Sequence, residues 1–75
     1  MKAKEIRKSA IDIIEFGIDR LAVNNLDIKT LKEDAIRNKI EIIFASGIGV
    51  ITDKEVSYYL KVNNKVLEAR ESMID

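Results

Sequence analysis

The chain of 75 residues contains neither cysteine nor histidine. Without cysteine it can form no disulfide bond and no thiolate metal site. Without histidine it lacks the commonest metal ligand and the usual general base near neutral pH. We therefore expect a non-enzymatic protein with no cofactor and no metal ion.

Aromatic residues, excess charge of one sign and long apolar runs are also scarce. Two Tyr and two Phe provide little material for stacking on unpaired bases. The 13 basic and 13 acidic residues cancel and are spread evenly, so no segment has the positive charge of a nucleic-acid-binding surface. The longest uninterrupted apolar tract, Ile42 to Ala45, is far shorter than the roughly 20 residues that span a bilayer. We expect a cytoplasmic protein that binds neither nucleic acid nor a membrane.

Apolar residues recur at helical spacing from residue 3 to about 24, which predicts an amphipathic first helix. Phe16 and Val23 fall on the side opposite the main apolar stripe, one heptad apart, and indicate a second contact surface. The polar side carries three carboxylates, Asp12, Glu15 and Asp19. A di-metal bundle would need Glu-x-x-His motifs from other helices, so we interpret these carboxylates as a solvated face.

A second helix is predicted over residues 28–46. Its start has two candidates: Asp27 as the N-cap, or Thr30 with Glu33 as a capping box. At its end, Gly47 followed by Ile48 fits a Schellman ending with Gly47 in the left-handed conformation.

This second helix is apolar on two sides. One stripe comprises Ile36, Ile40, Ile43 and Phe44, and a roughly opposite stripe comprises Leu31, Ala35, Ile42 and Ala45. A helix that is apolar all round is normally buried. The middle helix therefore contacts either both of its neighbours or one neighbour and a partner chain.

A third helix is predicted over residues 53–72. Thr52 and Glu55 match a capping box, and Ile51 with Val56 fits a hydrophobic staple. The helix then alternates steps of four and three residues through Val56, Leu60, Asn63, Leu67, Arg70 and Ile74, with Tyr59, Val66 and Met73 as a second line. Such a period is typical of the seam of a coiled coil or an antiparallel helical hairpin.

Two polar residues of this helix have alternative interpretations. Asn63 interrupts the seam, where it either fixes register and oligomeric state or lies in water at the seam's edge. Tyr58 faces away from the apolar line and is placed to anchor a partner, as exposed Tyr often does.

These patterns predict an all-α fold of one domain, residues 1–75, with an antiparallel hairpin of the second and third helices in a dimeric helical bundle. A chain this short buries only about 60% of its unfolded surface, and oligomerisation is the remaining common source of stability. The interface candidates are Phe16, Val23, Leu31, Ala35, Ile42, Tyr58, Tyr59, Asn63, Val66 and Met73.

The function that these features favour is that of a small interaction or regulatory protein, which self-associates and docks onto a partner protein. The partner's identity is not encoded in any motif. The alternative is a small helix-turn-helix DNA-binding regulator, because a short corner joins the second and third helices. Against it, the predicted recognition helix begins with Asp53, Lys54 and Glu55, whose acidic groups would face phosphates.

The segments Ile36–Ile40 and Thr52–Val56, separated by a Gly-containing bend, also resemble the helical hairpin of the small sporulation-regulatory aspartyl-phosphate phosphatases. That family carries Ser-Gln-Glu-Leu-Asp in its second helix, and its Asp acts on the phosphoaspartate of a response regulator. In the matching register this chain has Leu60 in place of the Ser and Asn64 in place of the Asp. The resemblance therefore implies response regulators as a class of partner, without the residues that perform the hydrolysis.

Overall fold

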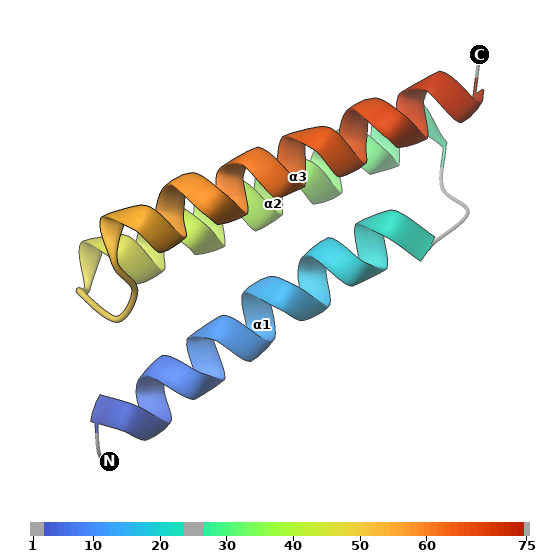
Figure 1. The fold of residues 1–75 in the computed structure, drawn as a ribbon. Helices are drawn as coiled ribbons and strands as arrows, with labels where there is room; N and C mark the ends of the chain where they lie inside the picture. Colours follow the sequence, from blue (N-terminus) through green and yellow to red (C-terminus); the bar gives the residue numbers. More distant parts are fainter. Residues whose placement is uncertain (1–2, 24–26, 75) are drawn as a thin grey trace.

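The computed structural model describes residues 3–23 and 27–74, and over these residues it contains three helices and no strand (Figure 1). The helices are α1 (Ala3–Val23), α2 (Ile28–Gly47) and α3 (Asp53–Ile74). The all-helical prediction and its three spans are confirmed to within two residues at each described end. Position 24, where the first helix was expected to end, lies outside the described residues.

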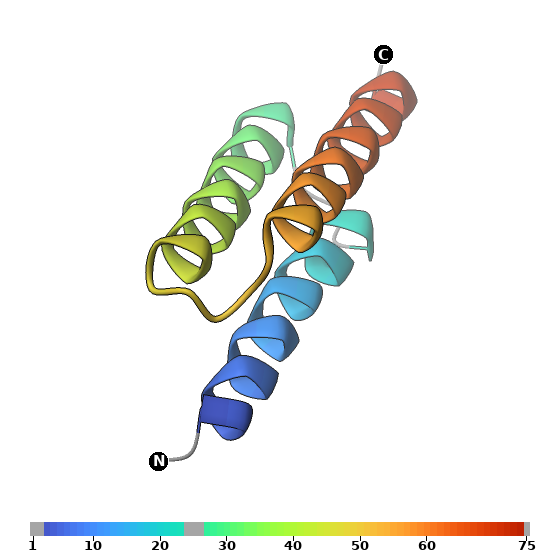
Figure 2. The ribbon, with the colours of Figure 1, turned by 60° about the vertical axis from the view of Figure 1, so that its left-hand side comes forward.

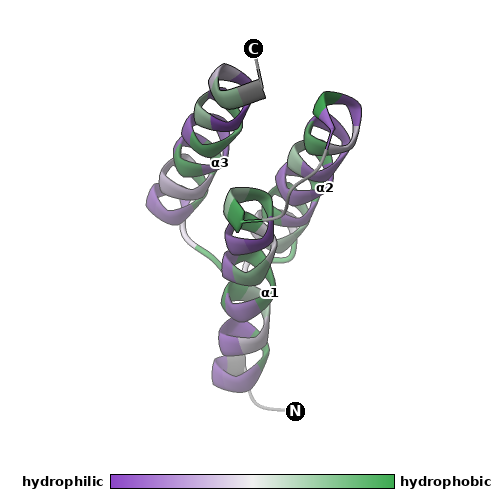
Figure 3. Ribbon diagram, turned by 90° about the vertical axis from the view of Figure 1, so that its right-hand side faces the viewer, coloured by the Kyte–Doolittle hydropathy of each residue, from purple (hydrophilic) through white to green (hydrophobic). Residues whose placement is uncertain are grey.

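The three helices pack into an elongated molecule of 44 × 20 × 14 Å. Figures 1 and 2 show α2 and α3 side by side, with α1 crossing beside them and its first turn at the same end as the corner between α2 and α3. Hydrophobic and hydrophilic bands alternate along each helix in Figure 3, as amphipathic helices require. None of the helices within residues 3–23 and 27–74 has an apolar stretch of the length that a bilayer crossing needs.

The start of α2 is capped by Asp27. Its Oδ1 accepts a hydrogen bond of 2.8 Å from the backbone N–H of Thr30, and its carbonyl accepts the first helical bond from Leu31. The hydrogen bond from Thr30 to the carboxylate lowers the pKa of Asp27. Of the two predicted starts, the Asp27 cap is therefore confirmed, and Thr30 lies inside the helix instead of capping it.

The end of α2 corrects one prediction. Val50 donates its backbone N–H to the carbonyl of Ala45, and Gly49 donates to Ser46, which is the Schellman pattern. The left-handed residue is Gly49, with φ 76°, whereas Gly47 belongs to the helix. The ending was expected at Gly47, and it occurs two residues later because Gly49 can also supply the positive φ. Val50, the residue after Gly49, then folds back onto the core.

The capping box at the start of α3 is confirmed. The Thr52 hydroxyl accepts from the N–H of Glu55 at 3.2 Å, and the Glu55 carboxylate accepts from the N–H of Thr52 at 2.8 Å. Both oxygens of Glu55 also accept hydrogen bonds from Arg7 of α1, at 2.8 and 2.6 Å. Arg7 donates further to the carbonyl of Val50 at 3.2 Å. The N-terminal half of α1 is thereby tied to the corner.

Two adjoining groups of buried apolar side chains form the core. The larger, near the corner, comprises Ile14, Ile18, Ile42, Ala45, Ile51 and Tyr59, and the smaller, near the other end, comprises Leu21, Leu31 and Ala35. All three helices contribute to the larger group, whereas the smaller group is built from α1 and α2 with Val66 and Leu67 of α3 against it.

A polar layer joins all three helices at the centre of the molecule. The Nδ2 of Asn38 donates to the carbonyl of Gly17 and to Oδ1 of Asn63, each at 3.0 Å. The Nδ2 of Asn63 donates to the carbonyl of Ala35, also at 3.0 Å. Asn38 is 0% exposed and Asn63 is 4% exposed. The alternative in which Asn63 lies in water at the seam's edge is therefore wrong.

Gly17 makes this layer possible. A Cβ at position 17 would collide with Oδ1 of Asn38, so only a glycine leaves room for the amide against the backbone of α1. That oxygen is buried and has no donor among the described residues. It faces the hydrogen that Gly17 carries in place of a side chain, and such a C–H···O contact compensates only weakly.

Candidate functional site

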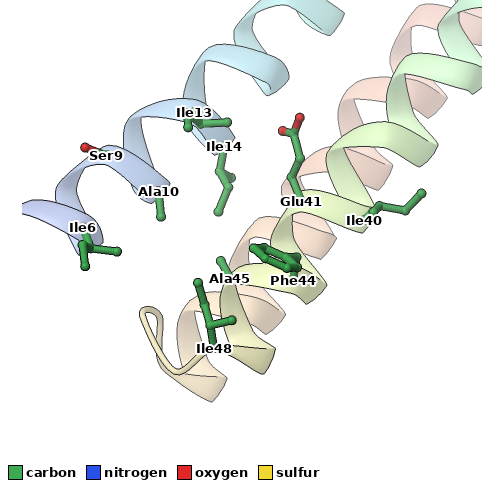
Figure 4. A pocket seen from close by; sticks show the side chains of 10 residues that line it. All are labelled: Ile6, Ser9, Ala10, Ile13, Ile14, Ile40, Glu41, Phe44, Ala45 and Ile48. Carbon is green, nitrogen blue, oxygen red and sulfur yellow. The ribbon is translucent and has the colours of Figure 1, made fainter. Parts of the chain in front are cut away.

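An apolar groove of about 570 Å³ lies between α1 and α2. Figure 4 shows Ile6, Ala10, Ile13 and Ile14 on the α1 side, and Phe44, Ala45 and Ile48 on the α2 side. Ser9, Ile40 and Glu41 complete the lining. Apart from the hydroxyl of Ser9 and the carboxylate of Glu41, the side chains around the groove are hydrocarbon.

The groove has a buried floor and exposed rims. Ile14 and Ala45 belong to the core and close the bottom. The rim residues stay open, with Phe44 66% exposed and Ile13 56% exposed. The small side chain of Ala45 does not fill the space between the rims. Large apolar side chains exposed together in this way are unusual on a monomer and mark an interaction surface more often than a scattered residue does.

The apolar surface continues from the groove around the outside of α2. Ile36, Ile40 and Ile43 lie there, spaced by four and three residues, and Ile40 is 62% exposed. Figure 4 shows Ile40 pointing away from α1, which links the groove to this outer side. We call the line Ile36, Ile40, Ile43 and Gly47 the outer seam. We call the outer seam together with the rim residues Ile6, Ile13, Phe44 and Ile48 the apolar face.

Phe16 extends the apolar face along α1. It lies three residues after Ile13, so the two side chains are neighbours on the helix surface. It is 67% exposed, and Val23 follows it one heptad later, also exposed. The structure therefore leaves both predicted candidates of the first helix open to solvent, on the flank that adjoins the groove.

Of the ten interface candidates, Phe16, Val23, Tyr58 and Met73 are exposed. Leu31, Ala35, Ile42, Tyr59 and Asn63 are buried inside the chain, and Val66 is partly buried. The expectation that Leu31, Ala35 and Ile42 face a partner is corrected, since these side chains pack against α1 and α3. Asn63 and Tyr59 likewise bond to groups of their own chain.

Sequence reasoning missed most of the apolar face. Ile36, Ile40, Ile43 and Phe44 were recognised as one stripe of the middle helix, but were not named as interface candidates. Asn38 was missed as the centre of the polar layer. Its signal was present, because Asn38 completes the steps of four and three residues that run through Leu31, Ala35, Ile42 and Ala45 on the inner side of α2.

A second, more polar hollow of about 310 Å³ lies between α1 and α3. It is lined by Glu15, Ile18, Asp19, Tyr58, Tyr59 and Val62. The rings of Tyr58 and Tyr59 meet edge to face with centroids 5.2 Å apart, and the Tyr59 hydroxyl donates to Glu15 at 3.4 Å. Burial and the neighbouring Glu15 carboxylate raise the pKa of Tyr59. Among the described residues no cluster of three acidic side chains could hold a metal ion.

Comparison with protein-family models, curated proteins and solved structures finds no match for this chain. The apolar face must therefore be interpreted from its own geometry.

Proposed function

We propose that this chain is a small non-enzymatic interaction protein with a regulatory role, which acts by docking its apolar face onto another protein chain. The observation that carries the proposal is the face itself. It joins a groove between two helices to a line of exposed isoleucines on the outside of α2. Grooves of this kind accept the apolar side of an amphipathic helix. Self-association is one form of such docking, and a different partner protein is the other.

In this proposal α2 and α3 form the antiparallel hairpin that supports the face. Three contacts support that arrangement. Lys32 near the start of α2 lies 3.8 Å from Glu71 near the end of α3, Asn38 meets Asn63 midway, and the capped corner joins the other two ends. A hairpin held at both ends and in the middle keeps the apolar face in place before a partner arrives, which reduces the entropy cost of docking.

Neither alternative gains an observation in its favour. For the helix-turn-helix, the first turn of α3 carries Asp53 and Glu55, and Glu55 is already engaged by Arg7 and Thr52. For the phosphatase-like hairpin, Asn64 in the position of the catalytic Asp has no carboxylate to offer. The cytoplasmic location expected from the sequence stays a prediction.

Photo-cross-linking in the source cell tests the proposal. A photoreactive phenylalanine analogue at Phe44 nearly preserves the native side chain, and the same analogue at the exposed Lys61 on α3 is the control. We expect covalent adducts with a protein, either this chain or another, from position 44 and far fewer from position 61. Adducts at background level from both positions would contradict the proposed function.

A further inference from the structure

The outer seam of α2 has the spacing of a second coiled-coil interface. Ile36, Ile40, Ile43 and Gly47 follow one another by four, three and four residues. The inner side of α2 shows the same steps, and there the helix packs against α3. Side chains repeated in this way interlock with those of a facing helix. On the inner side, α3 is that facing helix. On the outer side no described helix covers Ile36, Ile40 and Ile43, and each is more than half exposed.

Gly47 on this seam has no explanation within the chain. It lies in the last turn of α2, and the positive φ of the corner belongs to Gly49. Apart from its chain neighbours and the backbone of its own helix, no described atom lies within 4 Å of the place where its Cβ would be. Glycine disfavours a helix relative to alanine, so neither the turn nor the packing of this chain requires it. A bulky side chain from a second helix would fit in the space that Gly47 leaves.

The amount of exposed surface matches what a dimer needs to bury. The chain exposes 5404 Å². A folded monomer of 8.5 kDa is expected to expose about 4,700 Å², which leaves an excess of roughly 700 Å². A standard protein interface buries about 800 Å² on each partner. The excess is therefore close to one such interface.

We propose that the occupant of the outer seam is the α2 helix of a second copy of this chain, packed antiparallel about a two-fold axis between Ile40 and Ile43. This inference rests on the proposed function and names the partner at the same face. In this register Ile40 of one copy meets Ile43 of the other, and Ile36 meets the gap at Gly47. Every position of the seam then faces an apolar partner or a cavity that an isoleucine fills.

The charges that continue the seam favour the antiparallel direction. Counting back by the same steps, the next two positions are Glu33 and Lys29. In a parallel pair each of these would face its own counterpart, and like charges on facing positions repel. In the antiparallel register Glu33 falls opposite residue 50, beyond the end of α2, and both charges lie outside the overlap.

Disulfide trapping tests this register. Because the chain has no cysteine of its own, only the introduced cysteines can form disulfide bonds. Full-length chains carrying Ile40→Cys and Ile43→Cys are mixed in a glutathione redox buffer. Since a disulfide requires Cα atoms less than about 7 Å apart, we expect the mixed pair to form on the order of tenfold more than either chain pairs with itself. Trapping of Ile40→Cys with itself as readily as in the mixture would overturn the register. A Ser57→Cys chain, with its cysteine on α3 and outside the outer seam, is the control. If the mixed pair forms no more disulfide-linked dimer than this control chain does, the proposal is overturned.

Two charge substitutions provide the control without cysteine. Ile40→Glu lies on the outer seam and Met73→Glu lies on α3, and both side chains are exposed, so helix content by circular dichroism stays the same. In sedimentation velocity we expect Ile40→Glu to raise the dimer dissociation constant tenfold or more, on the order of a hot-spot loss, and Met73→Glu to leave it unchanged. Equal changes of the dissociation constant in the two variants would contradict the proposal.

This inference and the proposed function can fail separately. A chain that sediments as a monomer, yet still forms cross-links to another protein from position 44, would refute the second copy and leave the proposed function standing.

Discussion

At the residue scale, one buried amide accounts for two unusual features of the sequence. Asn38 uses both hydrogens of its amide nitrogen, one for the carbonyl of Gly17 and one for Asn63. A buried polar group is costly unless it is bonded in this way. The glycine in the apolar stripe of α1 and the asparagine in the seam of α3 are therefore parts of one contact.

We expect Gly17→Ala to lower the free energy of unfolding by about 2–4 kcal/mol. Alanine favours the helix by about 1 kcal/mol, but overpacking a fitted site costs roughly 1–3 kcal/mol, and displacing Asn38 breaks two buried hydrogen bonds worth about 1 kcal/mol each. Urea denaturation at a fixed protein concentration measures the difference.

The matched control for this substitution is the same change in an Asn38→Ala background. There the obstacle is gone, and Gly17→Ala should be neutral or stabilising, which a double-mutant cycle reports as a coupling between the two positions. A Gly17→Ala chain that is more stable than the parent would show that Asn38 does not press against α1.

The residue scale also shows which features could be predicted from the sequence. The Thr52 cap and its partner Glu55 were predicted and found, because a capping box depends only on residues three apart. Gly49 was missed as the left-handed residue since two glycines competed for the same role, and local spacing does not decide between them. Asn38 was missed although its spacing places it on the inner side of α2, because the hydrogen-bond partners that explain a buried amide lie on two other helices.

At the element scale, hydrophobicity alone gives the wrong prediction of which side of α2 is buried. The outer stripe has three isoleucines and a phenylalanine, whereas the inner side includes Ala35, Ala45 and the polar Asn38. Hydrophobicity alone would bury the outer stripe. The structure buries the inner side because its small side chains let the helices approach closely and its amide finds partners. The more apolar side of α2 is consequently left exposed.

The ion pair between α1 and the corner predicts how stability depends on pH. Hydrogen bonds from Arg7 and then from Thr52 lower the pKa of Glu55 from 4.5 to about 2. A carboxyl with a lowered pKa in the folded state stabilises the fold fully above its unfolded pKa, and this contribution is lost as the pH falls. We expect the part of the stability that Glu55 provides to disappear between pH 4.5 and about 2.

Titration of the Glu55 carboxyl carbon by NMR measures this pKa directly. In an Arg7→Gln chain the pKa should move up towards 4.5, yet stay below it, because the Thr52 hydrogen bond remains. An Arg20→Gln chain is the control, since Arg20 pairs with Asp34 and not with Glu55. An unchanged pKa in the Arg7→Gln chain would show that α1 is not held to the corner by this pair.

At the scale of the whole molecule, the fold was easier to predict than the surface that it presents. Helical periodicity and caps determined three helices and their ends, because these signals are local. Which apolar side faces outward depends on how three helices pack together, and no local pattern contains that information. The molecule is elongated, with a radius of gyration of 12.9 Å against about 11 Å for a compact chain of this length, because three helices of 21, 20 and 22 residues lie along its length.

The molar mass of the unmodified chain in solution tests the central claim, which is that a second copy of this chain covers the outer seam. Light scattering coupled to size-exclusion chromatography gives this mass over a dilution series. We predict a mass approaching twice the 8.5 kDa of one chain at high concentration, falling towards 8.5 kDa on dilution. A mass of 8.5 kDa at every concentration would contradict the claim.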